Sequence, residues 1–343
     1  MTNHTRTWIS GLILATALGT TARAETLLMN SWLPPTHSLV TDVFKPWAEE
    51  VGRLTDGDLE IRIPDASLGA PPRQYDLALD GVADITYGVT GYTPGRFNLP
   101  AIAELPQVGA KGEALSVALW RTYKEMFEQA GEFDEVKLLG LFANGTGVIM
   151  TTGDTGPITS IEDYAGRKFR VGGGVVQDIN TAIGGVNVAA PANEVYEILE
   201  QGVADGVLLP TDAYQGFNLT GVIDHATKVP GGFYTSAWFL LMNKDTWDGL
   251  PPEQQEAILS VSGEAFARMA GRQQDAGDEA GLEKMAADGV EIAEASPEFV
   301  AAIQERVAPI EEAWIQSAES EGVDGAAALE MFRSITREIE STE

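Results

Sequence analysis

The segment Gly166-Arg-Lys-Phe-Arg-Val171 carries the side chain of this sequence that is best suited to hold an organic anion. If the segment is a β-strand, its side chains alternate, so Lys168 and Arg170 share one face while Phe169 and Val171 share the other. Arg170 stands beside the carboxyl end of that strand, where its planar guanidinium could offer two parallel N–H groups to a carboxylate. An exposed salt bridge is the other common use of such a side chain. The pattern therefore leaves two interpretations for Arg170, a carboxylate ligand or a surface ion pair.

Residue patterns typical of catalysis and metal binding are sparse. The chain has no cysteine and three histidines, and neither His37 nor His225 has metal-ligand spacing. It has no Gly-x-Ser-x-Gly motif, no phosphate loop and no dinucleotide fingerprint. The run Gly172-Gly-Gly174 lacks the Lys and Ser/Thr that hold phosphates, so it favours a backbone that passes close to a ligand or another segment. We therefore predict binding without catalysis, with no cofactor and no metal.

Predicted strands and helices alternate along most of the chain. The expected strands cover residues 26–32, 59–63, 83–88, 136–142, 168–171, 206–209 and 239–242. The expected helices cover residues 38–54, 73–79, 161–166, 175–183, 193–200 and 251–287, the fifth capped by Asn193, with a last stretch after Pro297 bent at Pro309. This alternation predicts an α/β fold with largely parallel sheets, whose ligands lie beyond the carboxyl ends of the strands.

A short internal repeat suggests two similar lobes. Leu79-Asp-Gly-Val-Ala-Asp84 in the first half matches Gln201-Gly-Val-Ala-Asp205 in the second, and in both an amphipathic helix stops at Gly before a strand begins. We expect lobe 1 at residues 25–147 plus about 238–285, and lobe 2 with the C-terminal helices at 148–237 plus about 286–343. Two crossings between lobes make a hinge that can close over a ligand.

The N-terminus has the three parts of a secretory signal, which we place at residues 1–24. Arg6 lies in a short leading segment, an apolar run extends from Ile9 to Leu18, and Ala22-Arg-Ala24 matches the small-residue cleavage pattern. The apolar run is shorter than the roughly 20 residues that span a bilayer. We expect cleavage near Ala24 and a periplasmic protein without direct membrane insertion.

The charge balance excludes some partners. The chain has 22 Lys and Arg against 51 Asp and Glu, a formal net charge of −29, and the acids are scattered along it. Such a surface repels nucleic acid and anionic lipid head groups. Neither is expected as a partner.

The motifs together resemble the solute receptors of tripartite ATP-independent periplasmic (TRAP) transporters, over about residues 27–287. The residues that carry the resemblance are Gly166, Lys168, Arg170, Glu194, Tyr196, Leu199, Gly202, Asp205, Gly206, Met242-Asn-Lys244, Trp247 and Leu250-Pro-Pro252. The resemblance implies a two-lobed periplasmic-binding-protein fold, type II-like, with a long helix linking the lobes. It also implies Arg170 as the main carboxylate ligand and delivery of the solute to membrane permease subunits.

Two departures from that family bear on the ligand. Members that bind dicarboxylates usually have a second Arg where this chain has Asn144-Gly-Thr-Gly147, and an Asn where it has Leu209 before Pro210. Without that cation and amide, a second carboxylate would be buried unpaired at a cost of several kcal/mol. We therefore expect a small monocarboxylate rather than a dicarboxylate.

Other side chains could complete the site, although core packing or surface exposure is the alternative for each. The predicted ligand-binding residues are Arg170, Trp32, His37, Tyr87, Thr90, Tyr92, Glu104, Asn144, Gly172, Asp212, Tyr234 and Trp238. Glu104 or Asp212 could instead pair with an amine, and aromatic faces suit a cationic head group as well as an apolar one. A receptor for a small amine or amino alcohol such as ethanolamine, a periplasmic sensory module and a periplasmic enzyme stay open as alternatives.

Overall fold

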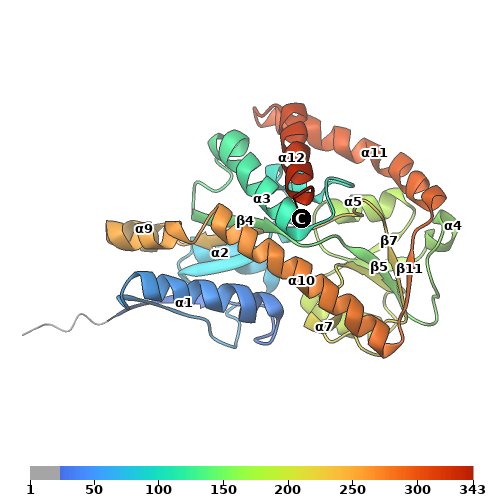
Figure 1. The fold of residues 1–343 in the computed structure, drawn as a ribbon, viewed down its shortest axis with the longest axis horizontal. Coiled ribbons are helices and arrows are strands. Elements are labelled where there is room, and N and C mark those ends of the chain that lie inside the picture. The colour runs from blue at the N-terminus through green and yellow to red at the C-terminus, as the bar shows by residue number, and fades with distance from the viewer. Residues whose placement is uncertain (1–23, 343) are drawn as a thin grey trace, which may run out of the picture.

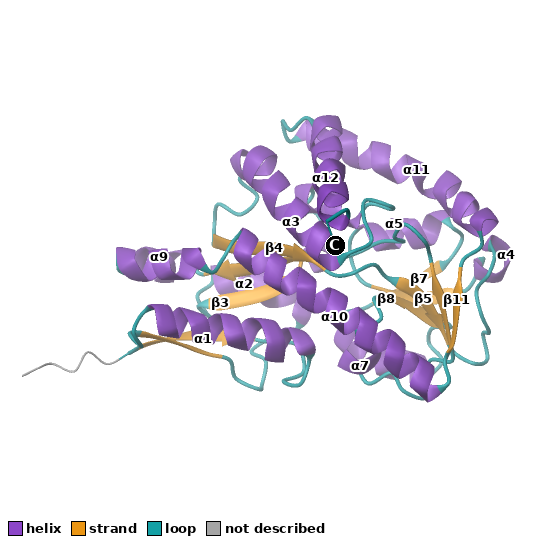
Figure 2. Ribbon diagram, in the orientation of Figure 1, coloured by secondary structure: helices purple, strands orange, loops and turns teal. Residues whose placement is uncertain are grey.

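The chain is described from residue 24 to residue 342 by a computed structural model, and it forms two α/β lobes, each built on its own β-sheet (Figures 1 and 2). The predicted signal peptide lies outside the described residues. None of the helices between residues 24 and 342 is both long and apolar enough to cross a bilayer. The α/β class and the two-lobed architecture expected from the sequence are confirmed.

The sheet of lobe 1 has the strand order β2-β1-β3-β10-β4. Its strands are β1 (Glu25–Asn30), β2 (Leu59–Arg62), β3 (Ile85–Val89), β4 (Lys137–Ala143) and β10 (Ala237–Met242). β10 runs antiparallel to β3 and β4, while β1 is parallel to its two neighbours. Helices α1 (Lys45–Leu54), α2 (Gln74–Leu79) and α3 (Gly112–Thr122) pack against β2, β3 and β4 respectively. The expected helix 38–54 is confirmed: the π-helix Leu39–Phe44 forms its first part and α1 its second.

The sheet of lobe 2 has the strand order β11-β9-β5-β8-β6-β7. Its strands are β5 (Val148–Thr151), β6 (Lys168–Val171), β7 (Val186–Ala189), β8 (Gly206–Leu209), β9 (His225–Lys228) and β11 (Glu291–Glu294). Its helices are α4 (Ile161–Tyr164), α5 (Val175–Ala182), α6 (Val195–Glu200) and α7 (Ala213–Gly216). The prediction that Asn193 caps a helix is wrong, because residues 192–194 form a 3-10 turn and the residue that precedes α6 is Glu194.

The repeated Gly-Val-Ala-Asp unit builds the same junction in both lobes. Gly81 and Gly202 each end a helix at φ 65°, a conformation that glycine adopts without steric cost. The aspartate that follows then accepts the backbone N–H of the neighbouring strand, Asp84 from Leu28 and Asp205 from Lys168, each at 2.7 Å. The four-residue repeat therefore marks a real structural repeat, in which a carboxylate begins the pairing of two parallel strands.

Long helices and a pair of crossing segments connect the lobes. Helix α10 (Glu264–Asp288) contacts α3 and β4 of lobe 1 and α7 and β11 of lobe 2, and it runs across both lobes in Figure 2. The C-terminal α11 (Pro297–Ser320) packs on α5, and α12 (Gly325–Glu340) packs on α3. The crossing segments β4–β5 and β9–β10 are hydrogen-bonded to each other, with Gly147 N–H to Tyr234 O at 2.8 Å.

The long helix predicted at residues 251–287 is two helices. After α8 (Lys244–Gly249), α9 (Pro252–Ser260) ends before Gly263, and α10 starts after it. Gly263 has φ 62°, and its N–H donates to Leu139 O in β4 at 2.7 Å. A left-handed glycine that is hydrogen-bonded to β4 therefore separates the two helices.

Candidate ligand-binding site

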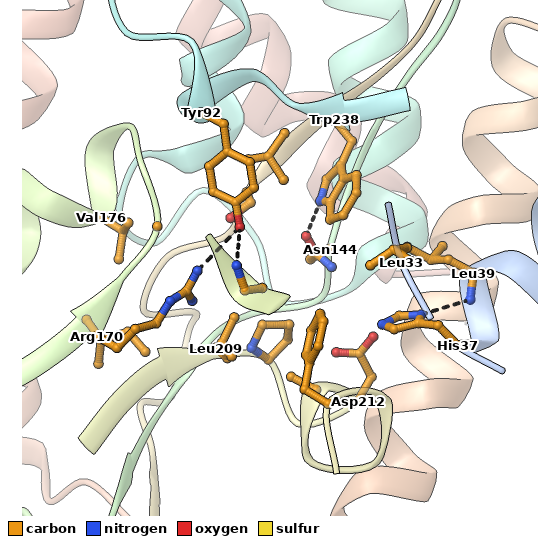
Figure 3. Close-up of a pocket in the computed structure, with 18 of the residues that line it drawn as sticks. Leu33, His37, Leu39, Tyr92, Asn144, Arg170, Val176, Leu209, Asp212 and Trp238 are labelled. Atoms are coloured by element: carbon orange, nitrogen blue, oxygen red, sulfur yellow. Dashed lines mark hydrogen bonds between the residues drawn. The ribbon is translucent and has the colours of Figure 1, made fainter. Parts of the chain in front are cut away.

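A cavity lies between the lobes, at the ends of β1, β3, β6 and β8. Its free volume is about 40 Å³, well below the roughly 300–1,000 Å³ of small-molecule sites, so the two lobes enclose little free space in this arrangement. The lining residues are Trp32, Leu33, His37, Leu39, Val89, Tyr92, Asn144, Arg170, Gly172, Val176, Ala192, Leu208, Leu209, Pro210, Asp212, Ala213, Phe217, Tyr234, Ser236 and Trp238 (Figure 3). Both lobes contribute, so a bound molecule would hold them together.

Arg170, at one end of the cavity, is a buried cation without a counter-charge. It is 1% exposed, and its Nε and one terminal nitrogen donate to the carbonyl oxygen of Ala190 at 3.0 and 2.7 Å. The other terminal nitrogen, Nη1, has no hydrogen-bond partner, and no carboxylate among residues 24–342 forms an ion pair with Arg170. Buried charges are normally paired and hydrogen-bonded. The arrangement suits a carboxylate that arrives with the ligand.

Two tyrosines flank this cation. The Tyr92 hydroxyl, from lobe 1, accepts hydrogen bonds from Arg170 at 3.3 Å and from the Ala192 N–H at 2.9 Å, both in lobe 2. Its own O–H is therefore left to donate to a ligand oxygen. Burial raises the pKa of Tyr234, which keeps that phenol neutral and able to donate as well. The Arg170 end thus combines a cation with hydroxyl donors.

Tyr234 also explains the first departure from the dicarboxylate receptors. A Cβ added at Gly147 would lie 2.0 Å from Tyr234 Cε1. The tyrosine ring therefore fills the space that a longer side chain at position 147 would need. At the second departure, Leu209 lines the cavity with an apolar side chain.

Aromatic side chains form one wall of the cavity. The Trp32 and Trp238 rings stack with centroids 5.5 Å apart and 7° between their planes, and the Tyr92 ring meets Trp32 edge-on at 6.0 Å. The Trp238 indole N–H donates to Asn144 Oδ1. Because that oxygen is occupied, the Asn144 amide nitrogen faces the cavity as a donor (Figure 3). This wall suits a flat apolar group.

The end opposite Arg170 is formed by His37 from lobe 1 and Asp212 from lobe 2 (Figure 3). The Phe217 ring of lobe 2 lines the cavity too and meets the His37 ring edge-on at 5.4 Å. Burial lowers the pKa of His37 to about 4, so its ring is neutral near pH 7. Burial and the nearby Asp278 raise the pKa of Asp212 well above its usual value. Asp278 Oδ1 accepts a hydrogen bond from the backbone N–H of Asp212 at 2.9 Å. Burial is the main cause that raises the pKa of Asp278 to about 7.

The two lobes touch directly beside the cavity. A Cβ at Gly173 would lie 1.6 Å from Gly91 O, so the predicted close approach of the glycine run is to the backbone of lobe 1. Glu104 lies at the same junction and accepts N–H groups from Val175 in lobe 2 and Ala237 in lobe 1, at 3.0 and 3.1 Å. Burial raises the pKa of Glu104 to about 7. These contacts define a closed arrangement of the lobes.

Most of the predicted ligand residues line the cavity, and three lie elsewhere. Those that line it are Arg170, Trp32, His37, Tyr92, Asn144, Gly172, Asp212, Tyr234 and Trp238. Tyr87 lies in the lobe 1 core, stacked on Phe44 at 3.9 Å. Glu104 is taken up by the lobe contact, and Thr90 donates to the carbonyl oxygen of Ala237 at 3.1 Å. The structure therefore does not bring Tyr87, Thr90 and Glu104 to the cavity lining, and each of these side chains has a structural partner elsewhere.

Sequence reasoning missed the apolar lining. Leu33, Leu39, Val176 and Phe217 reach the cavity from a loop and from helix ends on both sides. The only local signal was their position just after a strand or near an identified ligand candidate. In the sequence, an apolar residue that lines the cavity cannot be distinguished from one that packs in the core.

Comparisons with known proteins identify the family. A family model described as bacterial extracellular solute-binding protein, family 7, matches residues 29–317. The chain belongs to this family. A curated relative from Comamonas testosteroni, called outer membrane transporter protein TsaT, is 35% identical over 95% of this chain and 96% of its own. The TRAP receptor resemblance is thereby confirmed.

Solved structures of TRAP periplasmic solute-binding proteins share the fold. One from Bordetella bronchiseptica, with bound (R)- and (S)-mandelate, has 37% identity and a TM-score of 0.89 over 92% of this chain and 99% of that one. One from an unidentified marine microbe, described as specific for aromatic acid ligands and crystallised with 3-hydroxybenzoate, has 30% identity and a TM-score of 0.86 over 92% and 98%. This chain is therefore a solute-binding protein of the TRAP type.

Proposed function

We propose that this protein is the periplasmic receptor of a TRAP transporter that binds a small aromatic monocarboxylate between its lobes and delivers it to membrane permease subunits. The observation that carries the proposal is Arg170, a buried guanidinium with an unpaired Nη1 at one end of a cavity walled by stacked tryptophans. A carboxylate supplies the missing counter-charge, and an aromatic ring matches the wall. The mandelate and aromatic acids bound by the similar proteins support the same class.

The side chains around Arg170 favour one carboxylate over two. Tyr234 and Leu209 stand where a second cation and amide would be needed, and Asp212 places a further acid at the far end. A small amine fits this cavity less well, because its charge would lie near the buried Arg170 cation. Export, with cleavage of the leader near Ala24, is part of the proposal and follows from the signal-like N-terminus.

Isothermal titration calorimetry with matched ligands tests the ligand class. Benzoate or mandelate should bind, whereas benzamide and succinate should not. Arg170→Gln should weaken benzoate binding by about 2–5 kcal/mol, roughly 30-fold or more, because a buried charge pair loses one partner. Lys168→Gln is the matched control, since Lys168 is an exposed cation on the same strand. No binding of any aromatic carboxylate, or equal binding by the Arg170 variant, would refute the proposal.

Delivery to a permease is tested separately in cells. Uptake of labelled benzoate or mandelate at low concentration should require both this receptor and its permease subunits. Uptake that persists without the receptor would show that the protein binds the acid for another purpose.

A further inference from the structure

We infer that His37 and Asp212 form a second polar subsite, opposite Arg170, that reads a hydroxyl group carried on the ring of the aromatic acid. The inference rests on the proposed function and narrows its substrate class to ring-hydroxylated aromatic monocarboxylates. Its basis is a pair of buried polar side chains that face the cavity from different lobes, His37 at 4% and Asp212 at 7% exposure.

His37 presents a hydrogen-bond donor. Its Nδ1 accepts the backbone N–H of Leu39 at 3.3 Å, so the neutral ring carries its proton on Nε2. Figure 3 shows that second ring nitrogen turned toward Asp212 and the cavity. The edge of the ring packs against Gly216, where an added Cβ would lie 2.7 Å from Nε2. The donor is therefore held in place by both lobes.

Asp212 presents an acceptor. Its backbone N–H donates to Asp278, and among residues 24–342 the backbone of Ala213 is the one hydrogen-bonding group that lowers the pKa of the Asp212 carboxyl. In either protonation state the group keeps an acceptor oxygen for the cavity. Within residues 24–342, no hydrogen bond or ion pair joins Asp212 to His37, although both face the same space. Two buried polar groups that point into one space without a mutual bond imply a ligand group between them.

A hydroxyl group matches this pair better than other ring substituents. It can accept from His37 Nε2–H and donate to Asp212 at the same time, which satisfies both buried groups and joins the lobes. A methyl group satisfies neither, and an ammonium offers no acceptor to His37. A second carboxylate offers no donor, so it could bond to Asp212 only when Asp212 is protonated. A buried polar group left unpaired is costly, so such a subsite discriminates strongly against ligands without the hydroxyl.

Ligand pairs that differ only at the ring test the inference. Calorimetry would compare benzoate, 3- and 4-hydroxybenzoate and the corresponding methoxybenzoates, which accept but cannot donate. We expect at least one hydroxybenzoate to bind about tenfold or more tightly than benzoate, as for a hydrogen bond to a charged or buried partner. Its methoxy analogue should lose that advantage. In Asp212→Leu and in His37→Phe, the ratio of hydroxybenzoate affinity to benzoate affinity should fall to within about twofold, whatever the absolute affinity of each variant.

The outcomes separate the two proposals. Asp154→Leu, which changes an exposed aspartate of the same lobe, should keep the preference. Equal binding of benzoate and both hydroxybenzoates by the unchanged protein, or a preference that survives in both subsite variants, overturns the hydroxyl subsite but leaves the carboxylate receptor standing. Failure of every aromatic acid to bind overturns the receptor proposal itself. Circular dichroism and the benzoate titration show whether each variant is folded.

Discussion

Replacing Gly173 by Ala should block ligand capture while leaving each lobe intact. The added Cβ would lie 1.6 Å from Gly91 O, and the obstructing atoms belong to the backbone of the other lobe, so no side chain can turn away. Gly173 has no positive φ that would strain an alanine by itself. The clash exists only when the lobes are closed, so the open state should tolerate the change.

The cost can be estimated from the geometry. Overpacking in well-packed interiors costs about 1–3 kcal/mol, and a backbone contact as short as this one belongs at the upper end. If binding requires closure, about 3 kcal/mol against the closed state weakens the ligand roughly 150-fold. The stability of each lobe should be almost unaffected, so the loss of affinity should come from impaired closure.

Calorimetry and small-angle X-ray scattering together measure this effect. The unchanged protein should bind an aromatic acid and become more compact, whereas Gly173→Ala should bind weakly and stay extended. Gly249→Ala is the matched control, because an alanine Cβ there meets nothing within 4 Å. Normal affinity together with normal compaction in the Gly173 variant would refute the role of this glycine contact in closure.

Two further predictions concern pH and fluorescence. The pKa values of the Glu104 and Asp278 carboxyls are raised to about 7 in the fold, so the native state binds more protons than the unfolded state, and stability should fall as pH rises from about 4.5 to 7. For Glu104, the rise in pKa from 4.5 to about 7 corresponds to about 3 kcal/mol of unfolding free energy. His37 acts in the opposite direction: its pKa is lowered to about 4, so its contribution to stability falls as pH decreases below 6.5. Melting temperature against pH checks this, and a slope left unaltered by Glu104→Gln would contradict it. Ligand binding should also change tryptophan emission, because Trp238 lines the cavity. The change should be smaller in Trp238→Phe than in the control Trp120→Phe. Equal changes in the two variants would exclude Trp238 from the site.

Several parts of the fold follow from local sequence. Strand β6 was predicted at its observed bounds because the flanking glycine and the alternation of Lys168 to Val171 are local properties of the backbone. The paired lobes followed from the Gly-Val-Ala-Asp repeat, since a glycine in the left-handed region and an aspartate that receives the next strand can be recognised within five residues. The break at Gly263 was not predicted, although a left-handed glycine is a local signal there as at Gly81 and Gly202; its hydrogen bond to β4 exists only in the tertiary structure.

The sequence by itself determined the cation and its strand face, whereas only the tertiary structure decided what surrounds it. The sequence offers Glu104 and Asp212 as equivalent acidic candidates. In the structure, Glu104 accepts hydrogen bonds at the contact between the lobes, whereas Asp212 faces the cavity. Likewise, position 147 is a glycine because the Tyr234 ring occupies the adjacent space, a contact between residues distant in the chain. Backbone periodicity specifies the face on which a side chain lies, but the packing of one lobe against the other specifies which atoms meet there.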